Sequence, residues 1–138
     1  MYADRVFLHN EIGLAKFYVL DEYDDFILDF ESTILDVILN ITSNYASIMD
    51  GTVSQGCLFY KNTEWDIIFS FTYENENIKI SFNNNKQLII PSNKFYESIF
   101  ELSVISLNFL EYFYSGLNEN DQYIKMRQRI FRDLKPIA

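Results

Sequence analysis

The sequence contains few of the residues that build disulfides, linkers and common catalytic sites. Its 138 residues include one cysteine, one histidine, two prolines and four glycines. One cysteine forms no intrachain disulfide and builds no cysteine-rich metal cluster, which fits a reducing compartment. So few prolines and glycines leave no composition for a linker, and the length is typical of one domain. We therefore expect residues 1–138 to form a single domain.

Targeting and membrane-spanning segments are also missing from the pattern. The first residues show no basic stretch followed by an apolar run and a cleavage site, as a signal peptide would. The most apolar long stretch, residues 92–116, contains Glu97, Glu101 and Glu111 and is a poor transmembrane span. These features predict a cytoplasmic protein that makes no membrane contact.

Positive charge is scarce except at the C-terminus. Residues 1–124 hold 19 acidic and 6 basic side chains, a net charge of −13, whereas residues 125–138 hold 1 acidic and 5 basic side chains, a net charge of +4. A phosphate backbone is bound by neutralising it with lysine and arginine, so most of this chain would repel nucleic acid. The charge predicts a basic protein partner and no direct nucleic-acid binding.

Hydrophobic residues make up 49% of the chain and aromatic residues 17%, which indicates a sizeable packed core. The clearest core element is a helix over residues 92–116, which we expect to end at Gly116 with a left-handed cap. With two apolar stripes, this helix is predicted to be buried on both flanks. Replacing Phe100 or Phe109 with alanine would then cost about 3–5 kcal/mol. The first stripe is Phe95, Ile99, Leu102, Phe109 and Phe113.

The segment before it predicts two further kinds of element. Residues 6–9 and 14–20 are typical of a hairpin around residues 10–13, although the second stretch also fits a short helix. From residue 24 or 25 to Met49, apolar side chains recur at helical spacing, which predicts a long amphipathic helix. Asp21 and its acidic neighbours would then lie at the helix N-terminus, where they complement the macrodipole.

Four short strands are predicted between residues 55 and 90, at 55–61, 65–73, 78–82 and 86–90, each followed by turn-forming residues. In the middle two strands apolar and polar residues alternate, so one face of the meander is expected to be buried and one solvated. A last helix should run from Asp121 to about Leu134 with Asn120 as its N-cap. We interpret its basic side chains first as charges that complement the helix dipole, and second as an ion-pairing face. The expected fold is α+β: an antiparallel meander of about four strands packed against a long N-terminal helix, a central buried helix and a C-terminal helix.

Catalytic equipment is not recognisable in this chain. His9 lies in the least patterned segment, and Cys57 lies in an apolar strand pattern, where cysteine is usually a small hydrophobe. No glycine-rich phosphate loop is present. The alternation of Asp21, Tyr23 and Asp25 is similar to a calcium loop but lacks the central glycine and the bidentate glutamate. We expect no enzymatic activity, no cofactor, no metal and no small-molecule substrate.

Several short segments, taken in order, resemble one protein family over roughly residues 25–134. They are the helix that ends near Gly51, GCLF at 56–59, IIFSFTY at 67–73, LIIPS at 88–92, FY at 95–96, LEY at 110–112 and NEND at 118–121. In this layout the chain resembles the immunity proteins of bacterial contact-dependent growth inhibition, in particular those paired with ribonuclease toxins. The resemblance implies an α+β protein that binds the C-terminal nuclease domain of a delivered toxin and covers its active site. Residues 1–20 lie outside the resemblance, and the final helix is more basic than the family pattern implies.

This expectation agrees with the charge, because carboxylates can occupy the sites on a basic nuclease where phosphates bind. The predicted partner-binding surface is centred on the ends of the meander hairpins and its solvated face. It comprises Tyr60, Glu64, Trp65, Asp66, Tyr73, Glu74 and Glu76. A second acidic surface, residues 21–31 of the first predicted helix, stays open. An acidic adaptor or chaperone for a secreted effector is the alternative function, and an enzyme that uses surface carboxylates is a weaker one.

Overall fold

The four-stranded meander is present and has the predicted strand order. A computed structural model of the chain describes residues 13–21, 23, 25–59, 66–83 and 85–135. The strands are β3 (Gly56–Phe59), β4 (Ile67–Glu74), β5 (Asn77–Phe82) and β6 (Gln87–Pro91), and they pair antiparallel in the order β3-β4-β5-β6. Together with three α-helices in the described part of the chain they make an α+β fold, as predicted.

Alternation along the strands places large apolar side chains on one face of this sheet. Phe71 pairs with Ile80, and Phe69 pairs with Phe82, and all four side chains are buried. The turn between β4 and β5 has two central residues with positive φ, 53° at Asn75 and 65° at Glu76. Two such residues match the twist of a tight hairpin, so the local turn residues help to set the register of the sheet.

The prediction of a helix from residue 24 or 25 is wrong for its first part. Residues Phe26–Thr33 form strand β2, which pairs antiparallel with β1 (Leu14–Leu20) in a separate two-stranded sheet. The strand expected at 14–20 is therefore confirmed, but it pairs with residues 26–33. The strand expected at 6–9 lies outside the described residues. Leu28, Asp29, Phe30 and Glu31 also fit a period of two, so the same side chains satisfied both patterns.

The helix proper is α2 (Ile34–Met49), which starts after Thr33. Thr33 donates a hydrogen bond from Oγ1 to Asp36 Oδ2 (2.5 Å), and this pair marks the first turn. Eight of the 16 residues of α2 are buried, among them Leu35 and Ile38 at 0% exposure. The helix packs against β2, β3, β4, α3 and α4. It is α2, and not the helix after the meander, that lies at the centre of the fold.

Helix α3 (Ser92–Phe113) is buried along one side only, so the prediction of burial on both flanks is wrong. Its inner stripe includes Phe95, Ile99 and Leu110, whereas Phe109 and Phe113 are 51% and 57% exposed. The helix ends at Phe113, before Gly116. That glycine adopts the expected left-handed conformation (φ 82°) but precedes a short 3-10 helix, η2 (Leu117–Glu119).

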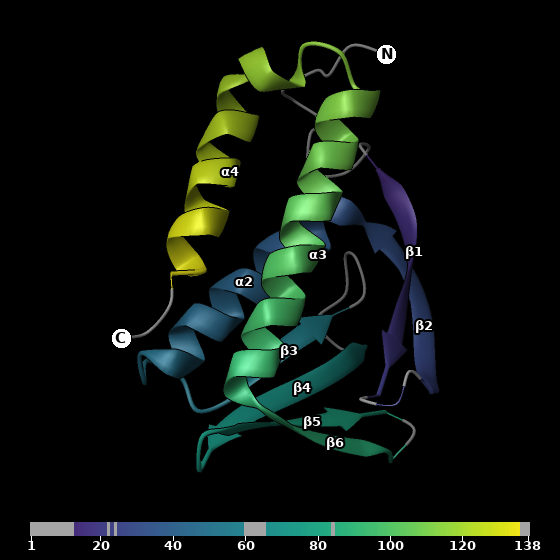
Figure 1. Ribbon diagram of the computed structural model, residues 1–138, viewed down its shortest axis with the longest axis vertical. Coiled ribbons are helices and arrows are strands. Elements are labelled where there is room, and N and C mark those ends of the chain that lie inside the picture. Colours follow the sequence, from purple (N-terminus) through teal and green to yellow (C-terminus); the bar gives the residue numbers. More distant parts are fainter. Residues whose placement is uncertain (1–12, 22, 24, 60–65, 84, 136–138) are drawn as a thin grey trace.

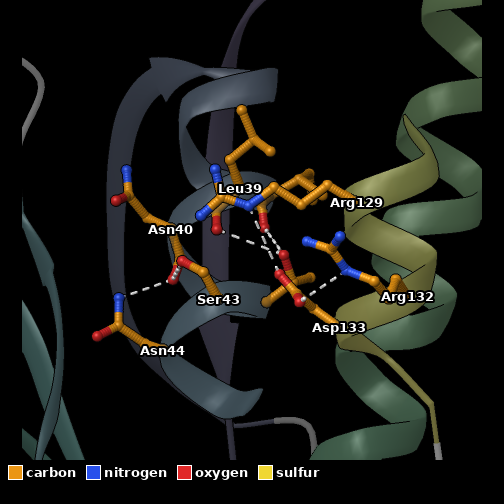
Figure 2. A network of polar contacts seen from close by, with 9 residues as sticks. Leu39, Asn40, Ser43, Asn44, Arg129, Arg132 and Asp133 are labelled. Carbon is orange, nitrogen blue, oxygen red and sulfur yellow. Dashed lines mark hydrogen bonds and ion pairs between the residues drawn. The ribbon is translucent and has the colours of Figure 1, made fainter. Parts of the chain in front are cut away.

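The C-terminal helix α4 (Asp121–Asp133) confirms its predicted position and its cap. Asn120 Oδ1 accepts a hydrogen bond from the Tyr123 backbone N–H at 3.0 Å. Figure 2 shows Asp133 between Arg129 and Arg132, with nitrogen-to-oxygen distances of 3.8 and 3.9 Å, on the side of α4 that faces α2. The basic side chains of α4 thus serve partly as intramolecular ion-pair partners.

Figure 1 shows how these elements are arranged. The β3–β6 sheet lies at one end of the molecule, α2 and α3 rise from it, α4 stands on one side and the β1–β2 hairpin on the other. Gly13 (φ +74°) connects the hairpin to the helices. Its N–H donates to the Tyr114 hydroxyl (3.1 Å), and its carbonyl accepts from Ile34 N (2.8 Å). A Cβ at Gly13 would lie 2.7 Å from Leu110 Cδ2, so this position requires glycine.

The two neighbouring residues Leu110 and Phe109 test the one-sided burial of α3. Leu110 is 0% exposed, so Leu110→Ala should lower the free energy of unfolding by about 2–5 kcal/mol. Phe109→Ala, in contrast, should lower it by no more than about 1 kcal/mol, because half of that ring already faces water. Urea denaturation of both variants measures the difference. Equal losses would contradict the exposed outer face of α3.

Tyr123 provides a second test of the core, because its hydroxyl is buried without a hydrogen-bond partner among the described residues. Burial, followed by the nearby charge of Glu111, raises the pKa of Tyr123. Tyr123→Phe should therefore keep or raise the free energy of unfolding, by about 1 kcal/mol. Because the folded-state pKa is raised, ionisation of the tyrosine lowers the free energy of unfolding further as pH rises above its unfolded pKa of about 10, and the variant should lose less stability there. A loss of stability at pH 7 would show that the hydroxyl has a stabilising partner.

Candidate protein-binding surface

The structure separates the predicted site residues into two groups. Tyr60, Glu64 and Trp65 lie outside the described residues. Asp66 precedes β4, while Tyr73, Glu74 and Glu76 lie at the far end of the same strand and in the turn that follows it. Eight positions along a strand at about 3.3 Å each place Asp66 and Glu74 roughly 26 Å apart. These carboxylates therefore do not form one cluster.

The group at the β4–β5 turn borders a shallow polar hollow of about 510 Å³. Tyr73 and Glu76 line it together with Met49 at the end of α2 and Asn93 at the start of α3. The Glu76 carbonyl accepts a hydrogen bond from Ser92 N (3.0 Å), which holds the turn against α3. Tyr73 is 40% exposed. This end of the sheet thus presents one aromatic ring and two carboxylates on a fixed turn.

A denser arrangement of the same kinds of side chain lies on the β1–β2 hairpin. On its inner face, Phe17 stacks on Phe30 with ring centroids 5.2 Å apart, and both rings pack toward the core. Because strand side chains alternate, the intervening residues point outward. We call this outer surface the hairpin face. Its strand members are the apolar Tyr18, Leu20 and Phe26, which are 60%, 46% and 57% exposed, and the acidic Asp29 and Glu31. We include the connecting turn, which adds Tyr23 (77% exposed), Asp21 and Asp25.

The hairpin face is strongly acidic. Residues 14–33 contain six acidic side chains and one basic one, Lys16. Lys16 Nζ lies 3.1 Å from Asp29 Oδ2 and 5.9 Å from the centre of the Tyr18 ring. The hydrogen bond to Asp29, and then the charge of that carboxylate, raise the pKa of Lys16 above its ordinary value. The other described carboxylates of the hairpin face, those of Asp21, Asp25 and Glu31, therefore leave an excess of negative charge beside the exposed apolar side chains.

Asp21 has a structural role within this surface. Its Oδ1 accepts hydrogen bonds from the backbone N–H groups of Tyr23 (2.8 Å) and Asp25 (2.9 Å), and its own N–H donates to the Asp25 carbonyl (2.9 Å). This is the pattern by which aspartate builds a turn. The calcium-like spacing of Asp21, Tyr23 and Asp25 is explained by these contacts. Within the described residues no group of three or more His, Cys, Asp or Glu side chains is placed to hold a metal ion.

The remaining candidates for chemistry offer no activated group in the described part of the chain. Cys57 is half-buried in β3, and burial raises the pKa of its thiol, which disfavours the reactive thiolate. His9 lies outside the described residues. None of the described helices is long and apolar enough to cross a membrane.

Comparisons with known proteins add nothing to what this geometry shows. Searches against protein-family models, curated proteins and solved structures found no match. The exposed Phe26 is not among the sequence-predicted candidates, because the pattern predicts a helix from residue 24 or 25, and Tyr18 and Leu20 are not among them either. The alternation in LAKFYVL at 14–20 was the signal that would have placed Tyr18 and Leu20 on one face.

Substitutions of Asp21 distinguish its role in forming the turn from its contribution to the charge of the hairpin face. Asp21→Ala should lower the free energy of unfolding by about 1 kcal/mol, because two backbone N–H groups lose their acceptor. Asp21→Asn keeps a side-chain oxygen and should lose less, although both variants remove the same charge. Glu31→Ala is the control, since it removes a charge from the hairpin face outside the turn. Equal stability of all three variants in urea would show that the Asp21 contacts do not hold the turn.

Proposed function

We propose that this chain is an immunity protein that binds the basic nuclease domain of a toxin and covers its active site. The observation that carries this proposal is the hairpin face, where four exposed apolar side chains are surrounded by carboxylates. Exposed apolar clusters with polar rims are typical of protein–protein interfaces. The proposal places the protein in the cytoplasm, without a catalytic turnover of its own and without a cofactor.

Aromatic side chains supply the contact energy in this mechanism. Tyr18, Tyr23 and Phe26 lose water when a partner covers them, and large aromatic residues at the centre of an interface are the ones that most often dominate its affinity. Protection of a cell requires tight capture, and a nanomolar dissociation constant corresponds to about −12 kcal/mol. Three or four anchors in one patch, with a polar rim that excludes water, are of the right kind to provide this.

Carboxylates raise the association rate constant and the specificity of binding in this mechanism. A nuclease that binds RNA presents lysine and arginine at its active site, and Asp25, Asp29 and Glu31 can occupy the positions of phosphates there. The net charge of −13 over residues 1–124 extends this attraction beyond the contact surface. The resemblance to immunity proteins of contact-dependent growth inhibition names the same partner, a basic nuclease domain.

The hairpin face is favoured over the meander ends because its charged and apolar side chains share one surface. Asp66 lies at the opposite end of β4 from Glu74 and Glu76, so the predicted meander surface would have to span the length of a strand. The group at Tyr73 is compact enough to serve as a second contact. The charge-reversal experiment compares these two surfaces.

The experiment uses the full-length protein and a toxin nuclease domain, which the proposal expects to be encoded directly upstream of this gene. Asp25→Lys with Glu31→Lys should lower the association rate constant at least about ten-fold and flatten its dependence on salt. Glu74→Lys with Glu76→Lys makes the same change in net charge and should have a much smaller effect. Phe26→Ala should raise the dissociation rate constant and weaken binding by more than about 1 kcal/mol. Stopped-flow or surface binding kinetics measure all three variants.

The reverse order of the two charge variants would move the interface to the β4–β5 turn. If neither pair changes association, electrostatic mimicry of phosphate is wrong. Inhibition of RNA cleavage by the wild-type protein tests the function itself. Binding only to an unfolded segment of the effector, with no inhibition of the folded nuclease, would instead support an adaptor or chaperone.

A further inference from the structure

A cavity of about 210 Å³ lies between the two sheets of this protein. Its walls come from four parts of the fold: the hairpin, α2, the meander and α3, represented by Phe17, Ile41, Phe82 and Ile99. The hairpin and the meander belong to separate sheets. No backbone hydrogen bonds of a shared sheet join the two described sheets, so side chains fill the space between them. Their packing leaves this volume open.

The walls of the cavity are apolar. Among the described residues that line it, Tyr18 and Ser98 alone have a polar side-chain group, and none is charged. A water molecule in a protein interior needs about two to four polar partners, and the described side chains of these walls offer only the hydroxyls of Tyr18 and Ser98. The lining thus disfavours water and favours an apolar occupant.

The size of the cavity sets the size of that occupant. An engineered cavity of about 150 Å³ lined by Leu, Ile and Phe stays dry and binds benzene or xenon. The present cavity is larger and has the same kind of lining, so it has room for about six to eight carbon atoms. Leu20 (46% exposed), Tyr18 (60% exposed) and the exposed Ser98 connect the lining to the surface, which provides a route of entry between the hairpin and α3.

We propose that this cavity binds a small, neutral, apolar molecule, such as a monocyclic aromatic or a medium-length alkyl compound. The molecule is a ligand and not a substrate, because the described lining presents no charged group and no cysteine. The proposal does not rest on the proposed function, because most of the lining comes from the inner face of the hairpin and from the core, and Tyr18 and Leu20 of the hairpin face lie only at its mouth.

Benzene is the probe ligand for the test, with the full-length protein. At a concentration ten times its dissociation constant, benzene should raise the folding equilibrium constant about 11-fold, which denaturant titration measures. Nuclear Overhauser effects should connect benzene protons to the methyl groups of Ile41 and Leu88. Wild-type protein that shows neither effect would overturn the proposal.

A matched pair of variants locates the site. Val37 is buried and lines the cavity, so Val37→Phe should fill part of it and abolish the response to benzene. Val53→Phe makes the same change at an exposed position that is not in the lining, and it should keep the wild-type response. Equal responses of the two variants would place benzene elsewhere and contradict the proposal. If Val37→Phe does not fold, the nuclear Overhauser effects in the wild-type protein decide.

Discussion

Burial of α2 is the constraint on which the rest of the structure depends. Its eight buried residues face the meander, the hairpin strand β2 and both other helices, so each of these elements covers part of one helix. The Tyr45 ring on α2 lies 6.0 Å from Phe95 on α3, and Phe95 lies 5.1 Å from Phe71 of β4. Helix, helix and sheet are thus connected through contiguous aromatic packing. Replacing a large apolar side chain of α2 with a smaller one would therefore weaken the packing of every layer.

This arrangement gives the β1–β2 hairpin one packed face and one exposed face. The inner face is engaged in packing through Phe17 and Phe30, and Gly13 fixes the start of β1 to the N-terminus of α2 and the end of α3. The outer face makes no comparable contribution to the core, so its exposed aromatic and acidic side chains are available for the contact proposed above. A two-stranded ribbon needs such packing on one side, because an isolated hairpin is only marginally stable.

Much of the fold follows from local signals that act over a few residues. The residues of the β4–β5 turn, the alternation along β4 and β5, and the Asn120 cap of α4 each depend on chemistry within their own segment, and all are confirmed. The error at residues 24–33 has the opposite origin. Those residues fit both periods, and pairing with β1 decided between them, which is a contact between separate segments. The sequence predicts the acidic residues 21–31 as an alternative surface but not the apolar side chains beside them, because these share a face only when the segment is a strand.

Composition and charge by themselves determined that this is an acidic α+β protein with a large core and no recognisable catalytic motif, since these properties belong to residue types and short spacings. Tertiary structure alone decided which helix is central and which aromatic rings face water. Phe109 and Leu110 are adjacent and both apolar, yet one is half exposed and the other is fully buried. Burial is a property of what packs against a side chain, and the inner side of α3 meets α2 and Gly13, which come from much earlier in the chain.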